Sequence, residues 1–212
     1  MINFRNIEFP DPKCADDDGL VAVGGDLKPD MLIAAYTQGI FPWTSNPYVT
    51  WWSPNPRAVF FPSEFKLSSR MERAYRNTKM IFTFDKDFRG VITGCAAPAK
   101  GREESWIDDN FIEAYCEMHR LSLAHSCEAW LDGKLVGGVY GIALRRFFAG
   151  ESMFHKVTNA STFCLNFLMK YLADNGFILF DSQVINPHTK YLGAQEISRD
   201  TYLSLLSQAL SL

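Results

Sequence analysis

Several features that identify a protein class at a glance are missing from this chain of 212 residues. Its 5 cysteines are scattered and form no Cys-x-x-Cys pair, so a disulfide framework is not predicted. Its 4 histidines show neither a His-Glu-x-x-His pattern nor close pairing, and the ligand spacing typical of a metal site is absent. We therefore expect reduced thiols and no bound metal.

Long apolar runs are also lacking. No stretch approaches the roughly 18 uninterrupted apolar residues of a membrane span. The opening segment, MINFRNIEFPDP, has no apolar core of a secretory signal. These absences predict a cytoplasmic protein without a membrane partner.

Aromatic residues are abundant, with 17 Phe, 8 Tyr and 5 Trp making up 14% of the chain. Hydrophobic residues make up 47% and charged residues 21%, which excludes global disorder. Since a typical domain has roughly 150 residues, the length predicts one full domain and a small extra module.

Charge is distributed unevenly. The 21 basic and 24 acidic residues give a net charge of −3, which alone argues against a nucleic-acid-binding protein. Residues 57–102, however, hold ten Lys or Arg against four acids. Such a segment can attract phosphate whatever the global charge, or it can be an ordinary solvated surface.

Helical periodicity begins at residue 68, after a turn-rich region in which Pro29 opens a short helix. In residues 68–77, a basic stripe of Arg70, Arg73 and Arg76 steps along one face.

The remaining pattern alternates between helical and strand periods. Gly137, Gly138 and Gly141 predict a bulge or a close approach in the second strand. The expected elements are helices 86–95 and 109 onward, strands 125–131, 134–144 and 147–154, helix 159–176, strand 177–184, a short helix near Lys190, strand 195–197 and helix 200–210. This order predicts an α+β fold and matches that of an N-acetyltransferase-like (GNAT) domain.

One aromatic segment stands apart. Residues 39–52 carry no charge and hold five rings: Phe41, Trp43, Tyr48, Trp51 and Trp52. They can form a small core or a wall for a planar ligand, and we favour the wall.

Two strand segments carry acidic side chains. Because residues i and i+2 of a strand share a face, we expect Asp181 to point with Gln183, and Glu151 with Met153. A carboxylate at the end of a buried strand needs a partner or a task. Asp181 therefore either holds a nearby backbone loop or takes part in chemistry.

The loop before the expected central helix, residues 155–161, contains no glycine. A glycine-rich loop is what cradles the pyrophosphate of acyl-CoA in acyltransferases of this fold. If the domain transfers acyl groups, we expect a donor other than acyl-CoA.

Several sequence blocks run in a specific order: GGDL (24–27), AYTQGIFPW (35–43), WWSPNPRAV (51–59), GESMF (150–154), NAS (159–161) and FDSQV–N–HT–LGA (180–194). Through these blocks, spread over nearly its whole length, the chain resembles the bacterial leucyl/phenylalanyl-tRNA–protein transferases. The resemblance implies transfer of Leu or Phe, and less efficiently Met, from aminoacyl-tRNA. The acceptor is the α-amine of a protein beginning with Arg or Lys, which is thereby marked for degradation by the N-end rule pathway.

The resemblance also implies a small N-terminal domain (1–60) and a GNAT-like catalytic domain (61–212) with a mixed, mostly antiparallel sheet. Neither ATP, a metal nor another cofactor is implied. Asp181 and Gln183 are placed at the reacting centre with Glu151 opposite. We interpret Gln183 as the contact to the attacking amine and Asp181 as the charge that polarises it, while Glu151 and Asp181 attract the cationic N-terminus.

By the same resemblance, a pocket for the Leu or Phe side chain is lined by Val139, Phe148, Met153, Leu165 and Leu168. Several of these are equally compatible with ordinary core. The positions around the terminal adenosine of the tRNA are Tyr36, Trp43 and Trp106. The stripe of Arg70, Arg73 and Arg76 then suits acceptor-stem phosphates, which position a nucleic acid without reading its sequence.

Two other classes stay open. One is a non-catalytic protein that binds tRNA ends or N-terminal degradation signals, against which the presence of Asp181, Gln183 and Glu151 argues. The other is a GNAT enzyme that uses acyl-CoA, which the glycine-free loop disfavours.

Overall fold

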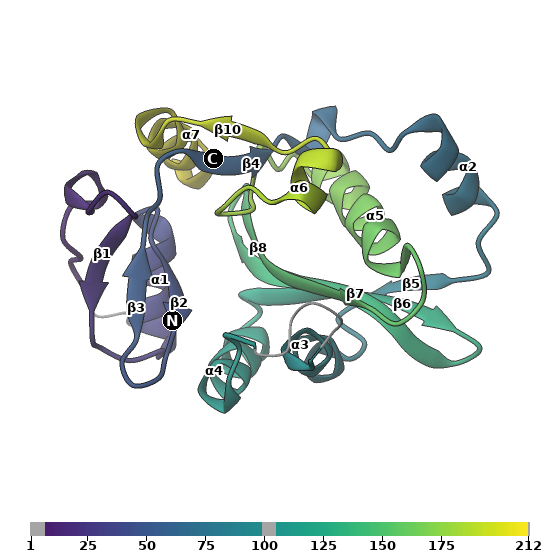
Figure 1. Cartoon of the computed structure of the whole chain (residues 1–212), viewed down its shortest axis with the longest axis horizontal. Coiled ribbons are helices and arrows are strands. Elements are labelled where there is room, and N and C mark those ends of the chain that lie inside the picture. Colours follow the sequence, from purple (N-terminus) through teal and green to yellow (C-terminus); the bar gives the residue numbers. More distant parts are fainter. Residues whose placement is uncertain (1–6, 99–104, 212) are drawn as a thin grey trace.

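The computed structural model describes residues 7–98 and 105–211. A small three-stranded sheet stands beside a larger seven-stranded sheet that carries helices on both faces (Figure 1). The expected α+β class and the mixed, mostly antiparallel sheet are confirmed. None of the helices in the two described stretches has the length and apolar character needed to cross a membrane.

The small sheet is built from the N-terminal part of the chain. Its strands are antiparallel in the order β1-β3-β2, so part of the uncharged aromatic segment forms strands. The elements are η1 (Pro12–Cys14), β1 (Leu20–Val23), α1 (Pro29–Thr37), β2 (Phe41–Thr44) and β3 (Thr50–Trp52).

The large sheet has the order β10-β4-β9-β8-β7-β6-β5, and only the pair β8–β9 is parallel. Two of its strands, β4 and β5, are not predicted from the sequence pattern. Although β4 belongs to the last residues of the expected N-terminal domain, it pairs with β9 and β10 in this sheet. The strands are β4 (Arg57–Phe60), β5 (Ile81–Phe84), β6 (Ala124–Leu131), β7 (Lys134–Leu144), β8 (Phe147–His155), β9 (Leu179–Asp181) and β10 (Gln195–Ile197).

Helices cover both faces of this sheet. In Figure 1, α5 lies on one face and α3 and α4 lie on the other. The side chains of Ser68, Asp87 and Asp108 cap α2, α3 and α4, which explains why these helices begin close to their predicted starts. The helices are η2 (Pro62–Glu64), α2 (Ser69–Arg76), α3 (Phe88–Ala96), α4 (Asp109–Arg120), α5 (Ala160–Asp174), α6 (Pro187–Tyr191) and α7 (Arg199–Ser211).

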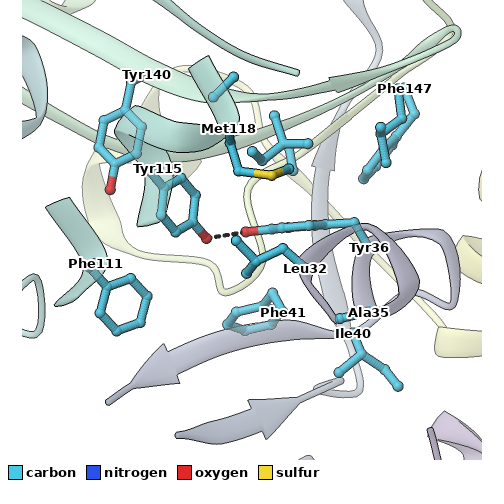
Figure 2. Close-up of a cluster of buried hydrophobic side chains, with 14 of the residues drawn as sticks. Leu32, Ala35, Tyr36, Ile40, Phe41, Phe111, Tyr115, Met118, Tyr140 and Phe147 are labelled. Carbon is cyan, nitrogen blue, oxygen red and sulfur yellow. Dashed lines mark hydrogen bonds between the residues drawn. The ribbon is translucent and has the colours of Figure 1, made fainter. Parts of the chain in front are cut away.

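The hydrophobic core falls into two clusters. One lies under α5, and the other joins the N-terminal elements to α3, α4 and α7. Figure 2 shows the second cluster, in which Leu32 and Tyr36 of α1 pack against Tyr115 and Met118 of α4. The N-terminal elements therefore have no core of their own and share one with the larger part.

The predicted strand 177–184 is too long. β9 covers only three residues, and Gln183 adopts a left-handed backbone with φ of 57°. The prediction that Asp181 and Gln183 share one face of a strand is therefore wrong, because the strand ends between them. A positive φ at a residue other than glycine is uncommon and identifies a position held by its surroundings.

The predicted bulge in the second strand is confirmed in β7, where Val136 has no partner between the pairs Ala129↔Gly137 and Trp130↔Leu135. A second bulge, which the sequence pattern did not predict, falls in β8 at Glu151. Tyr140 pairs with Ser152 and Gly141 pairs with Gly150, which leaves Glu151 without a partner in β7. A bulge interrupts the alternation of side chains and re-aims the extra residue. The simple rule that placed Glu151 and Met153 on one face therefore does not apply here.

Candidate active site

The site forms where two parallel strands separate. β8 and β9 pair from Phe147↔Leu179 to Ala149↔Asp181, after which β9 ends and β8 continues. The sheet opens at this point, between residues 150–153 of β8 and the loop 182–186. Two adjoining cavities occupy the opening.

Cavity A, of about 280 Å³, is bounded on one side by Phe41, Pro42 and Trp43 of β2. Cavity B, of about 300 Å³, combines apolar side chains from β4, β7, β8, β9 and α5 with polar ones, among them Ser152, His188 and Thr189. The residues that line both cavities surround their junction: Trp106, Glu151, Ser182, Gln183 and Asn186.

Glu151 is held by two tyrosines that reach it from different helices. Tyr36 Oη of α1 donates to Oε1 at 2.7 Å, and Tyr115 Oη of α4 donates to Oε2 at 3.3 Å. The two hydroxyls also bond to each other (Figure 2). Gln183 Nε2 lies 3.5 Å from Glu151 Oε1. Burial and, to a smaller extent, the nearby charge of Asp181 raise the pKa of Glu151 to about 8, against the lowering effect of the hydrogen bond from Tyr36.

Asp181 lies deeper and lines neither cavity. It is fully buried and accepts Arg57 Nε at 2.9 Å and Arg57 Nη2 at 2.7 Å, a two-point ion pair. Tyr202 Oη donates to Asp181 at 2.9 Å, and the backbone N–H of Gln183 donates to it at 2.9 Å. Asp181 thus contacts the loop backbone at Gln183 and holds its left-handed turn.

Arg57 is the partner that the sequence reasoning missed. It is 1% exposed, and its guanidinium lies over the rings of Phe41 and Tyr202 at 4.8 and 4.4 Å from their centroids. Burial lowers the pKa of Arg57, but the charge of Asp181 and its hydrogen bond, together with Tyr202 and Glu151, outweigh burial, and the pKa is raised. The available signal was an arginine at the start of the apolar run Arg57–Phe60, because a buried charge requires a counter-ion.

The structure brings together most of the predicted donor-binding residues. Trp43 and Trp106 line cavity A, whereas Tyr36 lies behind Glu151. Val139, Met153 and Leu165 line cavity B.

Phe148 and Leu168 are not in this group, because they line a separate cavity of about 200 Å³ beside Phe84 and Tyr171. Phe148 stacks on Phe180 at a centroid distance of 5.3 Å, and Phe180 forms part of the wall of cavity B. The stacked pair therefore separates the two spaces.

The predicted tRNA-binding residues lie elsewhere. Arg70, Arg73 and Arg76 are all exposed on α2. Figure 1 places α2 at the opposite end of the protein from the three-stranded sheet. Two further cations of the basic segment, Lys100 and Arg102, lie outside the described residues.

The junction combines a carboxyl group whose pKa is raised to about 8 with a carboxamide and an aromatic wall. This combination can orient an amine and accept its proton beside a planar ligand. Within residues 7–98 and 105–211, no group of three or more His, Cys, Asp and Glu side chains is arranged to hold a metal ion.

Comparison with known proteins agrees with this chemistry. A family model described as leucyl/phenylalanyl-tRNA protein transferase matches residues 59–207, and a model of the N-terminal domain of that family matches residues 25–55. The leucyl/phenylalanyl-tRNA–protein transferase of Shewanella halifaxensis is 45% identical over 209 residues, covering 97% of this chain and 89% of the relative. That of Thermodesulfovibrio yellowstonii is 46% identical over 202 residues, covering 95% and 83%.

Among solved structures, a GCN5-related N-acetyltransferase-like protein from Streptococcus suis aligns with a TM-score of 0.40 and 15% identity, covering 80% of this chain and 64% of that protein. The family models and the curated relatives span nearly the whole chain, and the residues of the junction fall within the matched segments. The chain belongs to the leucyl/phenylalanyl-tRNA–protein transferase family and is an aminoacyltransferase.

Proposed function

We propose that this protein transfers Leu or Phe, and less efficiently Met, from aminoacyl-tRNA to the α-amine of proteins that begin with Arg or Lys. The transfer marks these proteins in the cytoplasm for degradation by the N-end rule pathway. The observation that carries the proposal is the placement of Glu151 and Gln183 at the junction of an aromatic cavity and an apolar one.

The donor spans the two cavities. Its terminal adenosine occupies cavity A against Trp43 and Trp106, where stacking on an aromatic ring contributes about 1–3 kcal/mol per base. Its amino-acid side chain enters cavity B, whose walls include Val139, Met153 and Leu165. Because the ester joins these two parts, its carbonyl carbon lies at the junction.

The acceptor amine has a pKa of about 7.7–8.0, so a base must assist its reaction at neutral pH. Glu151 has a pKa of about 8, close to the value at which a general base works best. Gln183 orients the neutral amine, which attacks the ester carbonyl. The C–N bond forms, Glu151 accepts the proton that the nitrogen loses, and Glu151 then returns this proton to the ribose oxygen, which leaves as a hydroxyl as the C–O bond breaks. The donor ester is already activated, so the reaction uses no ATP.

Asp181 acts in this mechanism through Gln183. Its charge is paired with Arg57, and its bond to the backbone N–H of Gln183 sets the direction of the carboxamide. We therefore assign Asp181 as a positioning residue. Glu151 is the acidic side chain that lines the junction, and it also attracts the cationic N-terminal residue of the acceptor.

The direct test is to incubate the protein with labelled Phe-tRNA and a peptide that begins with Arg, without ATP or CoA. The expected product is the peptide extended by Phe, with a similar product from a Lys peptide and none from the same peptide beginning with Glu. Leu-tRNA and Met-tRNA serve as further donors, and Lys-tRNA should react poorly, because the part of cavity B formed by Val139, Met153 and Leu165 offers its charged side chain no partner. Tight binding of Phe-tRNA without any product would instead identify a non-catalytic binding protein.

Replacing the base is expected to change both rate and pH dependence. Glu151→Gln lowers kcat by about 10²–10⁴-fold, the usual contribution of a general base. Below pH 8 the wild-type enzyme loses activity because both the amine and Glu151 gain protons, so log(kcat/KM) rises with pH with a slope of about 2. The variant retains only the slope of about 1 due to the amine. If log(kcat/KM) rises with pH with the same slope in both proteins, Glu151 is not the base.

A matched pair of variants tests which residues form the donor pocket. Leu165→Phe narrows cavity B and should lower kcat/KM for Phe-tRNA relative to Leu-tRNA by about tenfold or more. Leu168→Phe fills the separate cavity and should leave this ratio unchanged. The two kcat/KM values are measured on the same variant, so their ratio does not depend on the fraction of that variant that is folded. A shift of the ratio in Leu168→Phe alone would place the pocket in the other cavity.

The proposed phosphate contacts on α2 predict a change in salt dependence. In a plot of the logarithm of the tRNA-binding constant against the logarithm of the salt concentration, the slope is negative. Replacing Arg70, Arg73 and Arg76 by Gln should reduce the magnitude of this slope by about 0.7–0.9 for each lost contact. The variant should react with an aminoacyl-adenosine donor, which has no acceptor stem, at the same rate as the wild-type protein. An unchanged slope for full tRNA would show that this helix face is only solvated.

A further inference from the structure

In the proposed reaction, no group has yet been assigned to stabilise the negative charge that develops on the ester carbonyl oxygen. Attack on the ester produces a tetrahedral intermediate whose carbonyl oxygen carries a negative charge. Enzymes of acyl transfer stabilise such an oxygen with fixed hydrogen-bond donors. The ester carbon must lie where cavities A and B meet, so the donor belongs among the residues that line both.

The backbone N–H groups of the three loop residues at the junction are already bonded. Ser182 N donates to Ala58 O at 3.0 Å, and Gln183 N donates to Asp181 Oδ1 at 2.9 Å. Asn186 N donates to Thr189 Oγ1 at 3.0 Å. An oxyanion hole made of these N–H groups would require the loop to break its own contacts.

Two of the polar side chains at the junction are engaged as well. Ser182 Oγ donates to Ala58 O at 3.2 Å, and Gln183 Nε2 points to Glu151 at 3.5 Å. Gln183 is also the group that orients the amine in the proposed function. Trp106 and Glu151 also have roles in the proposed function, as the stacking ring and the base, so the side chain that remains is the carboxamide of Asn186.

The amide of Asn186 is oriented by the start of α6. Its Oδ1 accepts the backbone N–H groups of His188 and Thr189, both at 2.9 Å, and Thr189 closes a reciprocal capping box. A flipped amide would turn its NH2 group toward these two donors, so the hydrogen-bond network fixes which end is oxygen. Thr189 is 5% exposed, which holds the box in place.

With its oxygen committed to α6, Asn186 presents Nδ2 away from the helix. In the described part of the chain, no protein oxygen accepts a hydrogen bond from this Nδ2, and Asn186 is exposed at the junction. α6 is only five residues long, yet its first turn supplies two N–H groups to this one side chain. The short helix therefore fixes the orientation of an amide at the junction of the two cavities.

We propose that Asn186 Nδ2 donates a hydrogen bond to the carbonyl oxygen of the donor ester as it becomes an oxyanion. This inference rests on the proposed function, since it concerns the same transfer. Asn186 makes no covalent bond and exchanges no proton. The C–N bond forms and the C–O bond breaks as described, while the amide holds the transient negative oxygen.

The test uses two substitutions that keep the helix cap. Both Asn186→Asp and Asn186→Ser retain an oxygen that accepts the N–H groups of α6, because Asp and Ser are good N-cap residues, but both lack the NH2 donor. Loss of one oxyanion donor typically lowers kcat by about 10²–10³-fold, and we expect this loss in both variants. KM for Phe-tRNA and the melting temperature should stay close to wild type.

Two donor analogues distinguish this function from a purely structural one. The first joins Phe to adenosine through a planar amide, and the second carries a tetrahedral phosphonamidate in place of the carbonyl. Asn186→Ser should bind the planar analogue as wild type does and the tetrahedral one more weakly, by about the factor lost in kcat. The ratio of the two affinities does not depend on how much protein is folded.

The proposal is overturned if both variants keep kcat within about threefold of wild type, well below the loss expected for an oxyanion donor. It is also overturned if the two analogues lose affinity equally, since that result describes a general disturbance of the cavity. If the wild-type protein itself fails to extend the Arg peptide, the proposed function fails first. If the wild type and both variants transfer Phe normally, the role of Asn186 is contradicted while the proposed function stands.

Discussion

The buried ion pair between Arg57 and Asp181 is the contact on which the rest of the site depends. Taking two charges out of water costs several kcal/mol per ion, roughly, and is tolerated only when further hydrogen bonds complete the arrangement. Here those bonds come from separate parts of the chain: the carbonyl of Gly39, the hydroxyl of Tyr202 and the backbone of Gln183. Removing either partner would leave an unpaired buried charge, at a cost of about 3–5 kcal/mol.

This pair determines where the sheet opens. β9 ends at Asp181, whose carboxylate holds the turned backbone of Gln183, so the chain leaves the sheet while β8 continues. Across the gap, the bulge in β8 directs Glu151 toward two buried tyrosines instead of into regular pairing. The catalytic geometry therefore results from two local departures from ideal strand structure, each held by buried hydrogen bonds.

The sequence predicted those elements whose signals are local. Caps such as Asp108 and the apolar period of α4 lie within one segment, and the observed helix follows them. β4 and β5 were missed because four-residue strands are stabilised by pairing with distant segments. Arg57 was missed for a related reason, because its counter-ion lies 124 residues away.

The resemblance to a known family placed Glu151, Gln183 and Asp181 together at the reacting centre; Glu151 and Gln183 line the junction, whereas Asp181 is buried behind it. Strand alternation wrongly put Asp181 and Gln183 on one strand face. Alternation is a property of regular strands, and neither segment is regular at these residues. Phe148 and Leu168 show that the sequence alone does not decide which of two neighbouring cavities a residue lines. Both are apolar and close to the pocket, but one stacked ring pair decides which of two neighbouring spaces they line.

The core that joins the N-terminal elements to α4 restricts how the enzyme can move. A hinge between these parts would have to separate Leu32 and Tyr36 from Tyr115, all of them almost fully buried. Exposing a core of this kind is characteristic of unfolding, whereas domain closure normally slides a smaller and more polar interface. We therefore expect the two segments that separate family models describe to melt together as one cooperative unit. The distance between β2 and the loop 182–186, which together bound cavity A, is then set when the chain folds.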